Sequence, residues 1–245
     1  MKTIIRYSIG PTTNAGIDCF HRSVESVRRI YKDVEIFVLI NDPHTNLRIK
    51  SKGLNIINQG RFRDSLSIKP RAGFNVHWKL YPPRLDPSSY EIFIDNDIVL
   101  NKEIDEVSRF LSATDSSFLV YEGLHRSFGS FDRFVPQGWR LNSGIFGLPP
   151  GYDFGGEIEL LFKKLQFIAW SNDYFDEQGV VASVMSNKNY NMIPLSKVPI
   201  IESDWDMLVH EQNEGLCGWH FVGINRYHHN SYSEYFCDEN SSSIS

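Results

Sequence analysis

Hydrophobic positions in the first sixty residues follow two different periods. Short apolar runs over 3–8 and 34–40 are typical of strands, the second of a strand covered on both faces. Between them, residues 14–31 carry an apolar side chain at every third or fourth position, which predicts an amphipathic helix with Asn14 as its N-cap. A third strand is predicted over 54–57. The order strand, helix, strand, loop, strand is typical of the start of a doubly wound α/β domain.

A run of β-branched and aromatic residues over 91–100 predicts a buried strand that ends in two carboxylates, Asp95 and Asp97. In an extended chain this spacing puts both side chains on one face, with Cα atoms roughly 6–7 Å apart. Ligands bind at the carboxyl ends of strands in open α/β sheets. Two like charges so close cost free energy unless a cation or hydrogen-bond donors compensate. A hard divalent cation shared with a phosphate would do so; the alternative is a solvated loop after an ordinary strand.

Helices and strands continue to alternate further along the chain. Helices are predicted over 76–85 (interrupted by two prolines), 103–111, 157–170 and 176–186, and strands over 117–121 and 142–147. The segment 122–140 has no clean period and is expected to be a functional lid or a disordered loop; its aromatic residues favour a segment that packs part of the time over a pure linker. Short strands are expected after residue 191, and the Ser-rich tail 239–245 is expected to be disordered.

Composition and charge narrow the class of protein. The 245 residues, 41% hydrophobic and 22% charged, are typical of a globular domain. A net charge of −5 argues against a nucleic-acid partner. No apolar run approaches the ~20 residues that span a bilayer, and Arg6 interrupts the N-terminal apolar stretch too early for a signal peptide. Cys19, Cys217 and Cys237 cannot all pair and lack metal-finger spacing, so we expect a reduced, cytoplasmic protein.

The order of these features resembles one enzyme family. A βαβ start, a strand ending in Asp-x-Asp, Asn-Ser-Gly at 142–144, an acidic-Gln helix start and a C-terminal His-aromatic-x-Gly follow one another as in GT-A-fold glycosyltransferases. The chain is most similar to the metal-dependent, retaining glycogenin and lipooligosaccharide galactosyltransferase type, over about 3–226. The resemblance implies one α/β, Rossmann-like domain over 1–238, with a mixed, mostly parallel central sheet flanked by helices. Its nucleotide-binding half would be 1–100 and its acceptor half 101–238.

The resemblance also implies a metal centre. Asp95, Asp97 and His220 match the residues that bind the metal and, through it, the donor diphosphate. Oxygen-rich ligation with one imidazole suits Mn²⁺ or Mg²⁺, and the nitrogen ligand favours Mn²⁺. Without the family pattern, a histidine between Trp219 and Phe221 is more typical of a core position.

Further residues receive roles from the same resemblance. The predicted catalytic residues are Gln178 and Glu177, beneath the anomeric carbon, with Asp176 and Asn142. By themselves, acidic residues at 176–177 are explained by the helix dipole. Arg226 stands where the family has a lysine, and Tyr227 and His228 replace the usual proline and tryptophan. The predicted donor-binding residues are Ser8, Ile9, Gly10, Asp42, Lys79, Asp95, Asn96, Ser143, Gly223 and Arg226.

The implied activity is transfer of a sugar from a nucleotide-diphosphate sugar, a UDP-hexose, to a glycan or lipid-linked acceptor, in the cytoplasm or at the inner face of the membrane. Because Gln178 is neutral and cannot act as a base, we expect retention; a carboxylate base, Asp176 or Glu177, would instead give inversion. A sugar-nucleotide nucleotidyltransferase shares the fold, but the chain lacks that class's Gly-rich loop after the first strand. A non-catalytic nucleotide-sugar-binding module is the third alternative, disfavoured by the intact aspartates.

Overall fold

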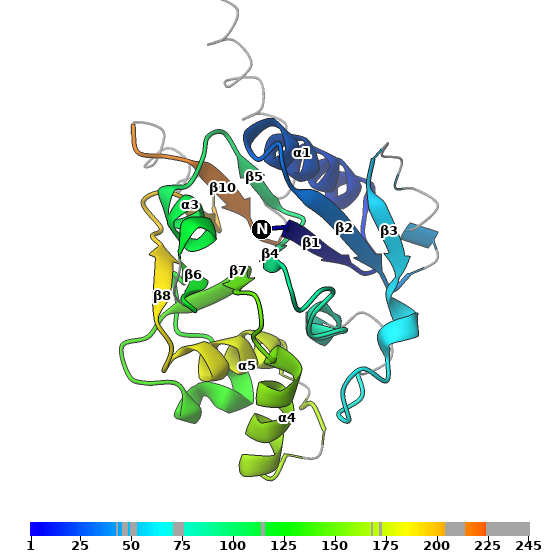
Figure 1. Cartoon of the computed structure of the whole chain (residues 1–245), viewed down its shortest axis with the longest axis vertical. Helices are drawn as coiled ribbons and strands as arrows, with labels where there is room; N and C mark the ends of the chain where they lie inside the picture. The colour runs from blue at the N-terminus through cyan, green and yellow to red at the C-terminus, as the bar shows by residue number, and fades with distance from the viewer. Residues whose placement is uncertain are drawn as a thin grey trace, which may run out of the picture.

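A seven-stranded mixed sheet forms the centre of the molecule (Figure 1). The computed structural model describes residues 1–42, 44–45, 49, 53–70, 76–113, 116–167, 169–171, 173–203 and 214–223. The strands of this sheet are β1 (Thr3–Ile9), β2 (Glu35–Ile40), β3 (Asn55–Asn58), β4 (Tyr90–Ile94), β6 (Phe118–Glu122), β7 (Leu141–Leu148) and β8 (Tyr190–Ile193), in the spatial order β3-β2-β1-β4-β7-β6-β8. Only β7 runs antiparallel to its described neighbours, β4 and β6. The predicted α/β class with a mixed, mostly parallel sheet is confirmed.

Helix α1 (Asn14–Ile30) covers one face of the N-terminal half of the sheet (Figure 1). The apolar positions that predicted the helix are buried: Phe20, Val24 and Val27 are at most 2% exposed. The expected N-cap was one residue too late, because Thr13 is the cap and its hydroxyl accepts a hydrogen bond from the Gly16 amide at 3.1 Å.

Side chains of β4 alternate between two hydrophobic cores, one on each face of the sheet. Ile92 and Ile94 join the cluster beneath α1, whereas Phe93 stacks on Phe146 in the cluster on the other side. The second cluster contains side chains of α4 (Phe154–Lys164) and α5 (Asp176–Met185), which lie together in Figure 1. A strand buried on both faces explains the uninterrupted apolar run of the sequence.

The prediction of one strand over 91–100 is wrong. The chain turns after β4, where the Ile98 amide donates to the Asp95 carbonyl at 3.3 Å, and β5 (Ile98–Leu100) leaves the main sheet. β5 pairs antiparallel with β10 (Gly218–Phe221), which also pairs in parallel with β9 (Ile200–Ile201). The Asp-x-Asp motif therefore lies in a turn between two sheets.

Two other helix predictions change in extent. The helix expected over 157–170 starts earlier, because the Asp153 side chain caps it by accepting from the Gly156 amide at 2.9 Å, and ends before Gln166, whose φ is +57°. The helix-like stretch over 76–85 is only the short 3-10 helix η2 (Val76–Leu80). Outside 122–140 the described residues also form α3 (Asp105–Ser112) and the 3-10 helix η1 (Gln59–Phe62).

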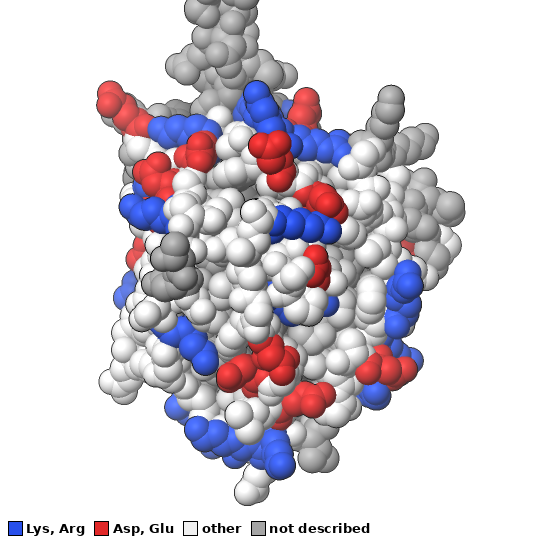
Figure 2. All heavy atoms as spheres, viewed as in Figure 1, with Lys and Arg blue, Asp and Glu red and all other residues white. Residues whose placement is uncertain are grey.

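The expected lid over 122–140 is partly built into the core. It contains the 3-10 helix η3 (Gly129–Phe134), and Phe128 and Phe131 are each 1% exposed. Gly179 of α5 allows this close packing, since a Cβ there would lie 2.2 Å from the Phe128 carbonyl oxygen. No helix among the described residues is long and apolar enough to cross a membrane. On the face drawn in Figure 2, acidic and basic side chains are interspersed.

Candidate active site and metal centre

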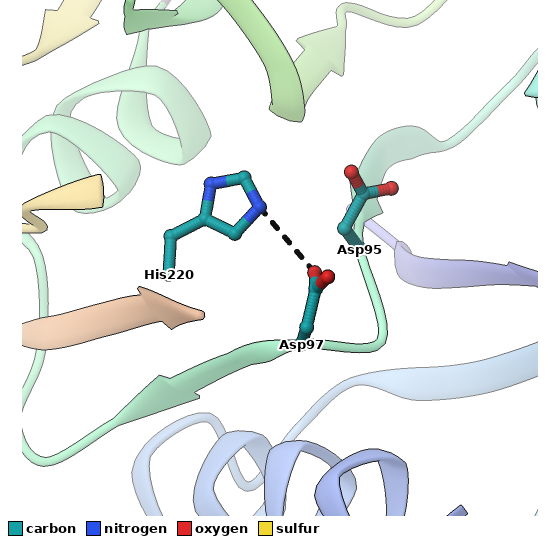
Figure 3. Close-up of side chains that lie close together, drawn as sticks. All are labelled: Asp95, Asp97 and His220. Carbon is teal, nitrogen blue, oxygen red and sulfur yellow. Dashed lines mark ion pairs between the residues drawn. The ribbon is translucent and has the colours of Figure 1, made fainter. Parts of the chain in front are cut away.

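Asp95, Asp97 and His220 converge where the two sheets meet (Figure 3). Each offers one ligand atom, and these atoms lie within 4.8 Å of one another. The Nε2 atom of His220 is 3.3 Å from Oδ1 of Asp97. Asp97 and His220 are buried, whereas Asp95 is partly exposed. The metal ligands expected from the sequence thus come together.

Strand register places His220 beside the aspartates. On β10, His220 pairs with Ile98, the residue that follows Asp97. Gly144 of β7 makes room for the imidazole, because a Cβ at this position would lie 2.7 Å from Cε1 of His220. The Gly144 carbonyl also accepts from the Asp95 amide at 2.8 Å. Gly144 therefore contributes to the site, although the sequence did not single it out as a site residue. Its position in the Asn-Ser-Gly motif could have indicated this role.

The converging residues fit a divalent cation. Two carboxylates and one imidazole form a donor set that suits Mn²⁺ or Mg²⁺. The Nδ1 atom of His220 is buried and has no hydrogen-bond partner among the residues that the structure describes. The other ring nitrogen, Nε2, lies 3.3 Å from Oδ1 of Asp97 and faces the carboxylates, as a metal ligand of this group would (Figure 3).

Lys79 of η2 connects the aspartates to the C-terminal half of the sheet. Its ammonium group lies 2.7 Å from Oδ1 of Asp95 and 3.6 Å from Oε1 of Glu177. It also donates to the Ser143 carbonyl at 3.1 Å. Burial lowers the pKa of Lys79, but the charges of Asp95 and Glu177 raise this pKa by more, so the net shift is upward. The ammonium group remains protonated beside both carboxylates.

Glu177 and Gln178 are held by hydrogen bonds to neighbouring segments. The Ser143 hydroxyl donates to Oε2 of Glu177 at 2.9 Å. Burial raises the pKa of Glu177 to about 7, although Lys79 acts in the opposite direction. Gln178 accepts from the Ser143 amide at 3.2 Å and donates to the Ser127 carbonyl at 2.6 Å. These partners fix the orientation of the Gln178 amide.

Two adjoining cavities hold most of the predicted site residues. The larger cavity has a volume of about 350 Å³. The predicted site residues that line it are Lys79, Asp95, Asp97, Asn142, Ser143, Glu177, Gln178, His220 and Gly223. The smaller cavity, of about 100 Å³, is lined by the predicted site residues Ser8, Ile9, Gly10, Lys79, Asp95 and Asn96. Lys79 and Asp95 line both cavities and mark the boundary between them. The structure thus brings together most of the residues predicted to bind the nucleotide and the metal or to act in catalysis.

Three predicted residues are not brought into these cavities. Asp176 lines neither, because its buried carboxylate accepts from the amides of Ser130 at 2.8 Å and Ser171 at 3.2 Å. Asp42 lines neither and caps the Thr45 amide at 2.6 Å. Arg226 lies outside the described residues, as does the predicted disordered tail.

A buried ionic network between Arg6 and Glu91 holds the backbone of η2 in place. Arg6 of β1 is 1% exposed and donates to the Lys79 carbonyl at 2.8 Å, the Pro82 carbonyl at 2.6 Å and Oε1 of Glu91 at 3.1 Å. Its guanidinium lies 4.5 Å from the centre of the Phe93 ring. Arg6 therefore fixes the backbone that carries Lys79. From the sequence, Arg6 served only to exclude a signal peptide. A charged residue within an apolar strand could also have indicated this buried ion pair.

Comparison with known proteins identifies the fold. No family model and no curated protein matches the chain. The structure is similar to the galactosyltransferase LgtC in complex with donor and acceptor sugar analogs (TM-score 0.55, 11% identity, covering 99% of this chain and 97% of that chain). It is also similar to mouse xyloside xylosyltransferase 1 (TM-score 0.55, 11% identity, covering 92% of this chain and 99% of that chain). A third similar structure is a glycosyltransferase involved in glycosylation of the major capsid of PBCV-1 (TM-score 0.51, 15% identity, covering 94% of this chain and 100% of that chain). The chain has the GT-A fold of these glycosyltransferases.

Proposed function

We propose that this protein is a metal-dependent glycosyltransferase that moves a hexose from a UDP-sugar to a glycan or lipid-linked acceptor. The observation that carries the proposal is the convergence of Asp95, Asp97 and His220 in the larger cavity, where Asp95 also lines the smaller one. The nucleotide would occupy the smaller cavity, beside Ser8–Gly10, and the transferred sugar the larger one. The GT-A fold supports this arrangement. A lipid-linked acceptor would bring the protein to the inner face of the membrane.

Breaking the sugar–diphosphate bond places negative charge on the leaving oxygen. A divalent ion held by Asp95, Asp97 and His220 would supply positive charge that stabilises this leaving group. The Lys79 ammonium, at the boundary between the cavities, would add a fixed positive charge on the same side. Since Lys79 stays protonated next to Asp95 and Glu177, it would act by charge and not as a proton donor.

We assign retention of anomeric configuration to the reaction. Gln178 lines the larger cavity, and a neutral amide cannot deprotonate an acceptor hydroxyl. Glu177 is held by the Ser143 hydroxyl and the Lys79 ammonium, which restrains it from swinging towards an incoming acceptor. Asp176 is used in hydrogen bonds to Ser130 and Ser171, so we assign it a positioning role. The acceptor would then arrive from the leaving-group side.

Slow hydrolysis of the donor by water tests the proposed activity without a known acceptor. The protein is incubated with a panel of UDP-hexoses and Mn²⁺, and release of UDP is measured. We expect release from at least one UDP-hexose, and its loss on addition of EDTA. No release with any UDP-hexose would contradict the proposal. Exchange of labelled pyrophosphate into a nucleotide sugar would instead identify a nucleotidyltransferase, and binding without turnover would identify a non-catalytic module.

A further inference from the structure

Residues 123–128, which follow β6, form part of the wall of the larger cavity. Leu124, His125 and Ser127 line this cavity, whereas Arg126 lines neither of the two cavities described above. Phe128, the next residue, is buried in the core. Residues 123–128 belong to no helix or strand, so hydrogen bonds from side chains are needed to fix the course of the chain here.

The guanidinium group of Arg126 binds the backbone that follows η3. Its Nη1 atom donates to the carbonyls of Pro136 at 2.7 Å and Trp139 at 3.4 Å. Its Nη2 atom donates to the carbonyls of Asp132 at 2.7 Å and Val135 at 2.8 Å. The Nε atom lies 2.9 Å from Oδ1 of Asp132. One side chain thus ties both halves of the segment 122–140 together.

These contacts require a guanidinium group and not only a positive charge. Arginine has five N–H donors in a planar fork, whereas lysine has three donors on one atom. A lysine ammonium could not bind four separate carbonyl groups and a carboxylate at once. The guanidinium carbon of Arg126 also lies 5.2 Å from the centre of the Phe128 ring, where the cation is attracted to the aromatic face.

Ser127, the residue after Arg126, orients the Gln178 amide. The Ser127 carbonyl accepts from Nε2 of Gln178 at 2.6 Å, and Oε1 of Gln178 accepts from the Ser143 amide at 3.2 Å. Ser143 lies on β7, so the sheet fixes its position. Ser127 lies outside helices and strands, between Arg126 and the buried Phe128. The orientation of Gln178 therefore depends on the residues that hold Ser127 in place.

We propose that Arg126 is a positioning residue for Gln178. By binding the backbone after η3, Arg126 keeps the Ser127 carbonyl where it orients the Gln178 amide towards the larger cavity. Arg126 itself touches neither the sugar nor the nucleotide. The inference rests on the proposed function only for the part that Gln178 plays in turnover.

The side-chain amide of Gln178 reports its own position by NMR, without any reaction. Comparing amide correlation spectra of the wild type and Gln178→Ala assigns its NH₂ signals. In Arg126→Ala we expect these signals to move towards those of a solvated glutamine. Guanidinium chloride, well below its unfolding concentration, should restore them, because the Arg126 side chain is 27% exposed and a small cation can reach its place. Unchanged signals in Arg126→Ala, or equal restoration by sodium chloride, would overturn the inference.

Release of UDP from a UDP-hexose tests whether this position matters for turnover. Arg126→Ala should lower turnover at least about tenfold and change the KM for the donor by less than about threefold. In the Gln178→Ala background the same change should lower turnover by less than about twofold, because the residue through which Arg126 acts is already removed. Equal fold losses in both backgrounds would overturn the inference, since Arg126 would then act on another group.

Arg133→Ala is the matched control. Arg133 belongs to the same segment and is exposed, and its guanidinium carbon lies 4.6 Å from the centre of the Phe134 ring. This variant should keep the Gln178 signals and the turnover of the wild type. Arg126→Lys is the second test variant if Arg126→Ala does not fold, which circular dichroism checks. It should show the same losses, and wild-type signals and turnover in Arg126→Lys would overturn the need for a guanidinium group.

The two readouts separate this inference from the proposed function. If the Gln178 signals move as expected but the wild type releases UDP from no UDP-hexose, the proposed function is wrong and the positioning role stands. If the wild type releases UDP while Arg126→Ala leaves both the signals and the turnover unchanged, the positioning role is wrong and the proposed function stands.

Discussion

The ammonium group of Lys79 lies 2.7 Å from Oδ1 of Asp95, one of the three proposed metal ligands. A positive charge at this distance repels a second cation on the same carboxylate. Lys79→Met should therefore raise the affinity for Mn²⁺ without nucleotide, by about three- to tenfold, while lowering release of UDP from a UDP-hexose. Calorimetry measures the first effect and the hydrolysis assay the second.

Lys69→Met is a control for loss of one positive charge, because Lys69 is exposed, pairs with Asp64 and lines neither cavity. It should change neither Mn²⁺ affinity nor hydrolysis. Weaker Mn²⁺ binding by Lys79→Met would show that the ammonium group supports the metal centre, contrary to our interpretation.

Glu177 should make the stability of the metal-free protein depend on pH. Its pKa of about 7 in the folded state lies above its ordinary value of 4.5. Between these values the folded state binds more protons than the unfolded state, so the free energy of unfolding falls as pH rises through this window. The fall attributable to Glu177 is at most about 3 kcal/mol.

Urea unfolding in EDTA at pH 5 and pH 8 measures this effect. Glu177→Gln, which keeps the shape and removes the charge, should flatten the pH dependence relative to the wild type. The same difference between pH 5 and pH 8 in both proteins would mean that Glu177 is ionised without cost in the folded state.

The Arg6–Glu91 pair predicts a non-additive effect on stability. Both side chains are fully buried, so Arg6→Met alone leaves the Glu91 carboxylate with fewer charge partners and should cost about 3–5 kcal/mol. The double variant Arg6→Met/Glu91→Leu should cost less than the sum of the single variants, since it removes the Glu91 carboxylate together with its Arg6 partner. Urea unfolding of the three variants gives the coupling energy; additive losses would show that the two charges do not interact.

Gln178 tests the proposed retention. Gln178→Ala should reduce turnover more than donor affinity, because the amide lies in the cavity proposed for the transferred sugar. Proton NMR of the product formed by the wild type should show an α-linkage from an α-linked UDP-hexose. A β-linked product would mean inversion, with Glu177 as the base.

Local sequence patterns were sufficient to predict an element where a segment's own residues determine its secondary structure. The apolar stripe of α1 and the apolar runs of β1 and β2 gave these elements to within one or two residues. Asp95 and Asp97 were recognisable because two carboxylates after a buried strand are costly without a partner. The order of short motifs then indicated the fold, which the structural similarity to glycosyltransferases confirms.

Local patterns did not predict contacts between distant segments, and only the resemblance to the enzyme family placed His220 with the two aspartates. The break between β4 and β5 depends on pairing with β10, more than a hundred residues later, and this pairing also brings His220 to Asp97. Asp176 was predicted as a catalytic residue from its sequence context, but its carboxylate accepts hydrogen bonds from Ser130 and Ser171, which only the fold brings close.

Calorimetric titration with UDP in the presence of Mn²⁺ and of EDTA is the most direct test of the proposed metal-dependent donor site. We predict that Mn²⁺ tightens UDP binding at least tenfold in the wild type, because the carboxylates of Asp95 and Asp97 otherwise repel the diphosphate. Asp97→Asn should lose most of this gain, whereas Asp105→Asn, an exposed carboxylate of α3 that pairs with Lys197, should retain it. Equal UDP affinity of the wild type with Mn²⁺ and with EDTA would contradict the metal-dependent donor site.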